Sequence, residues 1–116
     1  MQVQVNTDDN VQGREELARA VEEEVERVLG RFEDHLTRVE VHLSDTNAAK
    51  GGVADKRCMM EARPRGQQPV AVTHEAATLD EAIGGAAKKL RSRLEGLLGR
   101  LHEAKGAPSI RDNEQR

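Results

Sequence analysis

The chain contains no tryptophan or tyrosine, a single phenylalanine, Phe32, and a single cysteine, Cys58. One cysteine excludes an intrachain disulfide and a cysteine-rich zinc site, and we expect Cys58 to be a partly buried strand thiol. Proteins that read single-stranded RNA usually stack its bases on aromatic rings, so the near-absence of aromatics argues against that class. The core must be aliphatic, and 116 residues suffice for one domain.

Long hydrophobic runs are also missing. No stretch approaches the roughly 20 apolar residues of a membrane helix, and the start MQVQVNTDDN has neither the basic nor the apolar region of a signal peptide. We therefore expect a cytoplasmic protein without membrane contact. The four histidines do not occur at ligand spacing, and no nucleophile, base and orienting group can be assigned. We expect no metal, no cofactor, no small-molecule substrate and no enzymatic activity.

Basic and acidic residues are nearly balanced, with 18 lysines and arginines against 21 aspartates and glutamates. A surface for a polyanion must therefore come from segregated charge rather than from the net charge of −3. Residues 88–93 (KKLRSR) supply such a segment, because four of the six are basic in a chain that is net acidic. The same pattern also fits a solvated helix face, and the sequence pattern alone leaves both interpretations open.

Alternating apolar and polar residues predict four strands, and a 3.6-residue period predicts two helices. The strands are expected at residues 2–6, 37–44, 56–63 and 70–75, the helices at 14–34 and from 79 to about 101, and a flexible connection at 45–55. The order β-α-β-β-β-α predicts an α+β fold, a four-stranded sheet with two helices packed on one face. We assign residues 1–103 to this domain and 104–116 to a disordered polar tail.

Several segments resemble the ribosome hibernation-promoting factor family, also called the ribosome-associated inhibitor or sigma-54 modulation family. The start MQVQVNTDD resembles its first strand, and VEVHLSD followed by DKRCMMEARPRGQQPVAVTHEAATLDEAI resembles its sheet and the entry to its second helix. In AIGGAAKKLRSRL, Ala82-Ile83, Lys89-Leu90 and Leu94 match a pattern common in that helix. The resemblance extends from residue 1 to about residue 103 and rests on the joint match, since no single motif is diagnostic.

The resemblance implies a fold similar to double-stranded RNA-binding domains and a non-enzymatic function. Members bind the small ribosomal subunit and its ribosomal RNA near the decoding centre, where they block access of mRNA and tRNA in stationary phase or stress. Long members carry a second, dimerising domain, and we expect this chain to be a short form without one.

Structured RNA is recognised mainly through phosphates and 2′-hydroxyls, so lysines and arginines are the candidate site residues. The predicted RNA-binding residues are Lys88, Lys89, Arg91 and Arg93, supported by Arg27, Arg31, Lys56, Arg57 and Arg63. Neighbouring glutamates could instead simply pair with Arg27 and Arg31.

An alternative function is a protein–protein interaction or regulatory module on the same fold with weak RNA binding. The acidic first helix favours this alternative. Glu24 and its EEEVE run stand where many family members carry lysine, Asp80 replaces a common aromatic and Gly84 a common aspartate.

Overall fold

The computed structural model describes residues 1–8, 13–45 and 56–104. Its elements are β1 (Gln2–Thr7), α1 (Arg14–Leu29), a 3-10 helix η1 (Gly30–His35), β2 (Leu36–Asp45), β3 (Lys56–Pro64), β4 (Val70–Ala76) and α2 (Leu79–Ala104). The strands form a sheet in the order β1-β2-β3-β4, with β1 parallel to β2 and the other neighbours antiparallel. The predicted α+β class and element order are confirmed.

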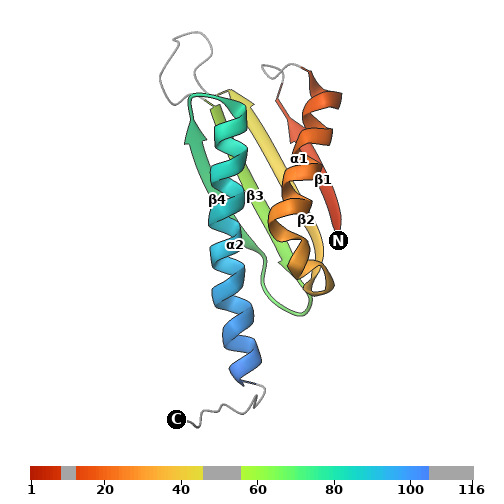
Figure 1. Ribbon diagram of the computed structural model, residues 1–116, viewed down its shortest axis with the longest axis vertical. Coiled ribbons are helices and arrows are strands. Elements are labelled where there is room, and N and C mark those ends of the chain that lie inside the picture. The colour runs from red at the N-terminus through yellow and green to blue at the C-terminus, as the bar shows by residue number, and fades with distance from the viewer. Residues whose placement is uncertain (9–12, 46–55, 105–116) are drawn as a thin grey trace.

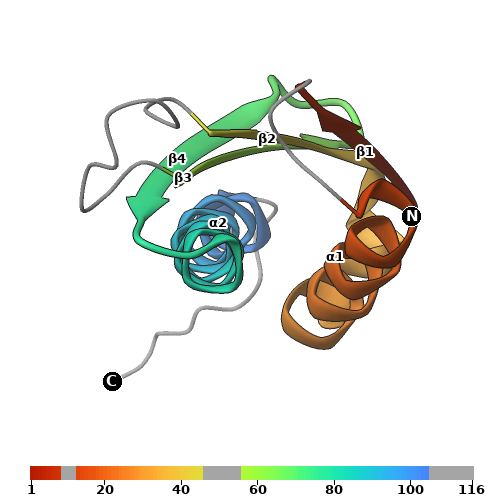
Figure 2. The ribbon, with the colours of Figure 1, turned by 90° about the horizontal axis from the view of Figure 1, so that it is seen from above.

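Both helices cover the same face of the sheet, and the opposite face carries no helix (Figures 1 and 2). The side chains buried between the two layers are aliphatic apart from Phe32 and the Cys58 thiol. Val39, Val41 and Leu43 alternate inward from β2, as the period of two predicts, and Leu90 and Leu94 join the same buried layer from α2. The sheet therefore presents one polar, open face and one buried face.

The first helix is shorter than the sequence predicted. We expected a helix through residue 34, whereas α1 ends at Leu29 and the 3-10 turn η1 leads into β2. Gly30 weakens the helix at this point, and the tighter turn still buries Phe32 while it delivers Leu36 to the start of β2. Of the predicted connection at 45–55 and the predicted tail at 104–116, Asp45 belongs to β2 and Ala104 to α2. The remainder of both segments lies outside the described residues.

Two adjacent glycines of α2 have different surroundings. A Cβ atom at Gly85 would overlap the imidazole of His74 on β4, so the missing side chain lets the ring pack directly on the helix backbone. A Cβ atom at Gly84 would lie 4.0 Å from Glu24 Oε2, which is an ordinary contact. Gly85 therefore permits the close approach of α2 to β4, whereas Gly84 does not require its missing side chain.

Alanine substitutions at these two positions should act in opposite directions. We expect Gly85→Ala to lower the free energy of unfolding by about 1–3 kcal/mol through overpacking, and Gly84→Ala to raise it by about 0.5–1 kcal/mol through helix propensity. Urea unfolding of both variants measures the difference. Equal stabilisation by the two substitutions would contradict the close packing of His74 on Gly85.

The thiol of Cys58 lies in the buried layer, and burial raises its pKa from 9.0 to about 12. Between these two values the folded state holds a proton that the unfolded state has lost. The free energy of unfolding should therefore fall as pH rises from about 9 towards 12, and this contribution is fully present below pH 9. Denaturant titrations of the wild type and of Cys58→Ala across this range test the prediction, because the variant lacks this thiol and should show a shallower decline.

Candidate nucleic-acid interface

Three basic side chains of α2 lie along one side of the buried stripe. At 100° per residue, Lys89, Arg93 and Arg100 fall within about 40° of one another around the helix axis, and all three are exposed. The amino group of Lys89 donates a hydrogen bond to the Thr73 carbonyl oxygen of β4, with a separation of 2.9 Å. This set, called the basic flank below, therefore lies beside the free edge of β4.

The helix turns the four basic side chains of residues 88–93 towards different sides of α2. Arg91 projects towards α1, on the side where Glu95 binds Arg31, and it is half-buried. Lys88 is exposed on the side of α2 that faces away from the sheet. In the part of the chain that the structure describes, none of the four basic residues of this segment pairs with a carboxylate.

The hydrogen bond from Lys89 gives this residue a structural role in addition to its charge. Edge strands present unpaired backbone groups that invite pairing with another chain, and a lysine at the edge opposes such pairing. Lys89 donates a hydrogen bond to one of these carbonyl groups, near the middle of β4. The carbonyl takes one of the three N–H donors of Lys89, so two remain for a phosphate, and Arg93 has no acidic partner among the described residues.

The two arginines predicted on the first helix are exposed and already paired. Arg27 forms two hydrogen bonds to Glu24, at 3.2 and 2.8 Å, and Arg31 binds Glu95 of α2. The Arg31 guanidinium also lies 4.8 Å from the centre of the Phe32 ring. The structure thus shows the glutamate pairing that the sequence left open, although the partner of Arg31 lies 64 positions away on α2.

The three predicted residues on β3 differ in their surroundings. Lys56 binds Asp45 at 3.0 Å, and Arg63 binds Glu61 at 3.2 Å and approaches Glu40 at 3.6 Å. Arg57 is exposed, and no carboxylate within the described ranges pairs with it.

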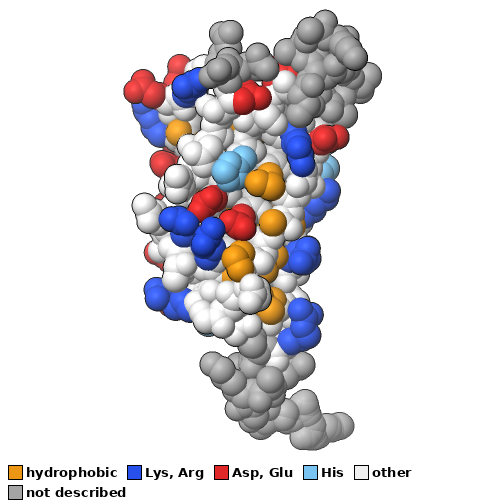
Figure 3. Space-filling view, turned by 180° about the vertical axis from the view of Figure 1, so that it is seen from behind, with side chains coloured by type: hydrophobic (Ala, Val, Ile, Leu, Met, Phe, Trp, Pro, Cys, Tyr) orange, Lys and Arg blue, Asp and Glu red, His pale blue; other side chains and the backbone are white. Residues whose placement is uncertain are grey.

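The open face of the sheet is acidic at its centre and basic around it (Figure 3). Glu40 and Glu61 are opposite one another on β2 and β3, and Arg38 and Arg63 bind them from the adjoining positions. Because these charges neutralise one another, the centre of this face offers a phosphate less attraction than the basic flank does.

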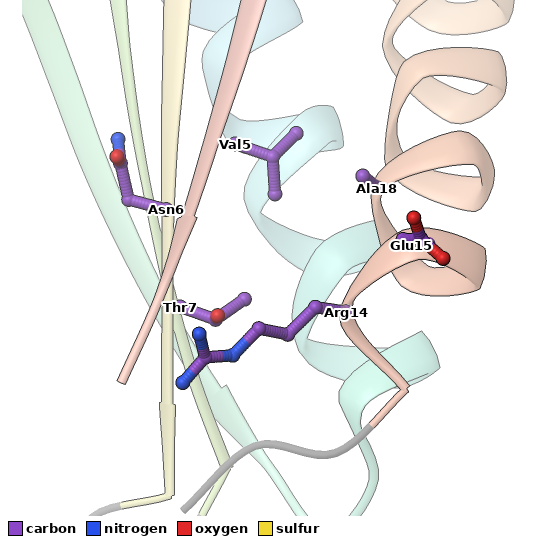
Figure 4. A pocket seen from close by; sticks show the side chains of 6 residues that line it. All are labelled: Val5, Asn6, Thr7, Arg14, Glu15 and Ala18. Carbon is purple, nitrogen blue, oxygen red and sulfur yellow. The ribbon is translucent and has the colours of Figure 1, made fainter. Parts of the chain in front are cut away.

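A hollow of about 380 Å³ lies between β1 and the start of α1 (Figure 4). Val5, Thr7 and Ala18 line it, and the Arg14 side chain extends across it towards Thr7. It is on the β1 side of the molecule, away from the basic flank. Within the described residues, no group of three or more His, Cys, Asp or Glu side chains could hold a metal ion, and no helix is long and apolar enough to cross a membrane.

Sequence reasoning placed the basic residues correctly on α2 but did not include Arg100 among the site residues. The spacing 89, 93, 100 was the signal that could have identified it, since it continues the same side of the helix. Glu95 was missed as well, and no local pattern could have revealed its contact with Arg31.

Comparison with known proteins agrees with this fold. The family model described as "Sigma 54 modulation protein / S30EA ribosomal protein" matches residues 6–102. No curated protein matches the chain. Among solved structures, the N-terminal domain of Protein Y from Thermus thermophilus superposes with a TM-score of 0.67 at 22% identity, covering 84% of this chain and 99% of that domain.

A second similar structure is a ribosomal subunit interface protein from Coxiella burnetii, with a TM-score of 0.63 and 17% identity, covering 85% of this chain and 99% of that one. At these identities the two structures support the fold, while the family model covers most of the sequence. The resemblance predicted from the sequence is thereby confirmed: the chain belongs to the sigma 54 modulation protein / S30EA ribosomal protein family, a family of ribosome-associated proteins.

Proposed function

We propose that this protein binds the small ribosomal subunit near the decoding centre and blocks access of mRNA and tRNA during stress or stationary phase. It would act in the cytoplasm by occupying the site rather than by catalysis. The observation that carries the proposal is the set of basic side chains on α2 that have no acidic partner among the described residues, on a fold that belongs to a ribosome-associated family.

The charges of α2 suit structured RNA better than single strands. Lys88 and Arg93 are exposed, and Arg91 adds a half-buried guanidinium on the side that faces α1. Phosphate contacts of this kind need no aromatic side chains, and the one aromatic ring, Phe32, is buried. In this proposal α2 faces the ribosomal RNA, and Arg57, which is exposed and has no carboxylate partner in the described ranges, remains a candidate contact at the edge of the otherwise ion-paired open face.

Arg27 of α1 and Arg31 of η1 would take part by exchanging their carboxylate partners for phosphates. Arg27 and Arg31 remain 68% and 62% exposed in their ion pairs with Glu24 and Glu95. Exposed ion pairs contribute only about 0–1 kcal/mol, so a phosphate at the same place could replace the carboxylate. Glu24 and Glu95 would thereby weaken RNA binding without abolishing it.

Removing the carboxylate that holds Arg31 should strengthen RNA binding. We expect Glu95→Gln to bind ribosomes more tightly at low salt and to steepen the dependence of log K on log salt by about one unit, the value of one added phosphate contact. Glu23→Gln is the matched control, because it makes the same change in net charge at an exposed α1 position without an ion pair in the described structure. An equal effect of both variants would mean that Arg31 does not reach RNA.

Cosedimentation with separated ribosomal subunits at low and moderate salt tests the function directly. We expect the protein to pellet with the small subunit and to be released by salt, and Arg93→Ala to lower the log–log slope by about one unit. Arg19→Ala is the control, because Arg19 is an equally exposed arginine on the far side of α1. Full binding of the Arg93 variant would remove this residue from the site.

The alternative function is a protein–protein interaction or regulatory module on the same fold. The exposed glutamates of α1 and the pairing of its arginines favour it. Absence from every ribosomal fraction at low salt, together with salt-insensitive binding to a protein partner, would support this alternative and overturn the proposed function.

A further inference from the structure

A row of acidic side chains lies on the opposite side of the molecule from the basic flank. Glu15, Glu22, Glu26 and Glu33 follow one another at intervals of seven, four and seven residues along α1 and η1, and all are exposed. No basic side chain within the described ranges pairs with any of them. They form the acidic flank.

The two flanks lie beside the two free edges of the sheet. Glu15 lines the hollow beside β1 together with Val5 and Thr7, whereas Lys89 reaches β4. β1 and β4 are the outermost strands of the described sheet, with α1 beside β1 and α2 beside β4 (Figure 2). The β1 side therefore carries the acidic flank, together with the exposed arginines Arg14 and Arg19 of α1, and the β4 side carries the basic flank. Charges of opposite sign are therefore separated by the full width of the sheet.

The charges on the two flanks also have matching intervals. Lys89, Arg93 and Arg100 are separated by four and seven residues, as are Glu22, Glu26 and Glu33. The two helices run in the same direction in the molecule (Figure 1). If a second copy lies side by side in the same orientation, Lys89 and Arg93 of one molecule therefore meet Glu22 and Glu26 of the other, since each pair is spaced by four residues on an α-helix. Glu33 lies beyond them on η1.

We propose that the basic flank of one molecule docks on the acidic flank of a second copy of this chain. The contact joins two different surfaces, so it is heterologous and leaves one free flank at each end, which allows further copies to add. It consists of exposed ion pairs, and each such pair is weak and screened by salt. The association is consequently weak, increases with protein concentration and weakens as salt concentration rises.

Self-association would regulate the RNA-binding surface. Lys89 and Arg93 serve both contacts, so a molecule docked on its neighbour cannot present them to RNA. Ribosomes would then compete with the second copy for the same flank, and this part of the inference rests on the proposed function. The docking itself does not depend on it and can be measured in the absence of RNA.

Sedimentation equilibrium of the purified full chain, at about 0.01 M and about 0.15 M salt, tests the docking, since the screening length falls from about 30 Å to about 8 Å between them. We expect oligomers that grow with protein concentration at the lower salt and a shift to monomers at the higher salt. A monomer at every concentration at low salt would overturn the proposal.

Charge reversals identify the surfaces involved. Arg93→Glu with Arg100→Glu, and separately Glu26→Lys with Glu33→Lys, should each give monomers at low salt. These pairs leave Lys89 and its bond to β4 intact, so loss of the edge contact cannot explain the result. The variant that combines all four changes has the original net charge, with the sign of the charge reversed at each of the four positions. Association should return in this variant.

Glu16→Lys with Glu23→Lys is the matched control for the acidic reversal. These exposed glutamates are also seven residues apart on α1 but point away from both sheet edges, and the change in net charge is the same. Association equal to wild type in this control supports the flank contact, whereas loss equal to that of the Glu26 and Glu33 pair would show a net-charge effect and overturn it.

Ribosome binding separates the two proposals. Glu26→Lys with Glu33→Lys should abolish self-association without lowering ribosome binding. The variant with all four charge reversals should self-associate but bind ribosomes poorly. If the wild type forms salt-sensitive oligomers but never pellets with ribosomes, the docking stands and the proposed function fails. If it pellets with ribosomes and is monomeric at low salt, the function stands and the docking fails.

Discussion

The close contact of α2 with β3 and β4 is the interaction on which the site depends. The helix meets the sheet through Ala82, Ala86 and Ala87, which are fully buried, and through Gly85, on which His74 packs. Without large aromatic side chains to fill a wide gap, the two layers must approach closely to exclude water. This approach brings Lys89 within hydrogen-bonding distance of the β4 backbone and fixes which side of α2 stays exposed.

On this protein, the arrangement of ion pairs rather than the number of charges determines where a basic surface is exposed. Arg27 and Arg31 beside α2, and Arg38 and Arg63 on the open sheet face, are held by glutamates, among them Glu24, Glu40 and Glu95. The arginines of α2 have no acidic partner within the described structure. A net acidic molecule can thus present a locally basic surface, because a polyanion responds to the charges within a screening length rather than to the total.

In the proposed function α2 faces the phosphates, because its basic side chains have no acidic partner within the described structure. The acidic flank of α1 would be repelled from that surface and remains available for a cationic one. Lys89 connects these possibilities, since its amino group can cap a strand edge, meet a phosphate or meet a carboxylate of a second molecule. The bond to the strand uses one of its three N–H donors, so the remaining donors can meet either a phosphate or a carboxylate.

The sequence by itself determined the element order, the inward faces of the strands and the basic segment of the second helix, because these depend on periodicities of two and 3.6 residues that neighbours in the chain express. It also carried enough of the family pattern to identify the family. It overestimated the first helix, since the turn at Gly30 depends on burying Phe32 against a sheet that forms from distant residues.

Only the tertiary structure decided which charges remain unpaired. The contact of Arg31 with Glu95 joins residues far apart in the sequence, the pairing of Arg63 with Glu40 requires the register of β2 against β3, and Lys89 meets Thr73 because α2 packs beside β4. Pairing depends on distances of a few ångströms between side chains of different elements, and those distances are set by packing of the whole domain rather than by local sequence.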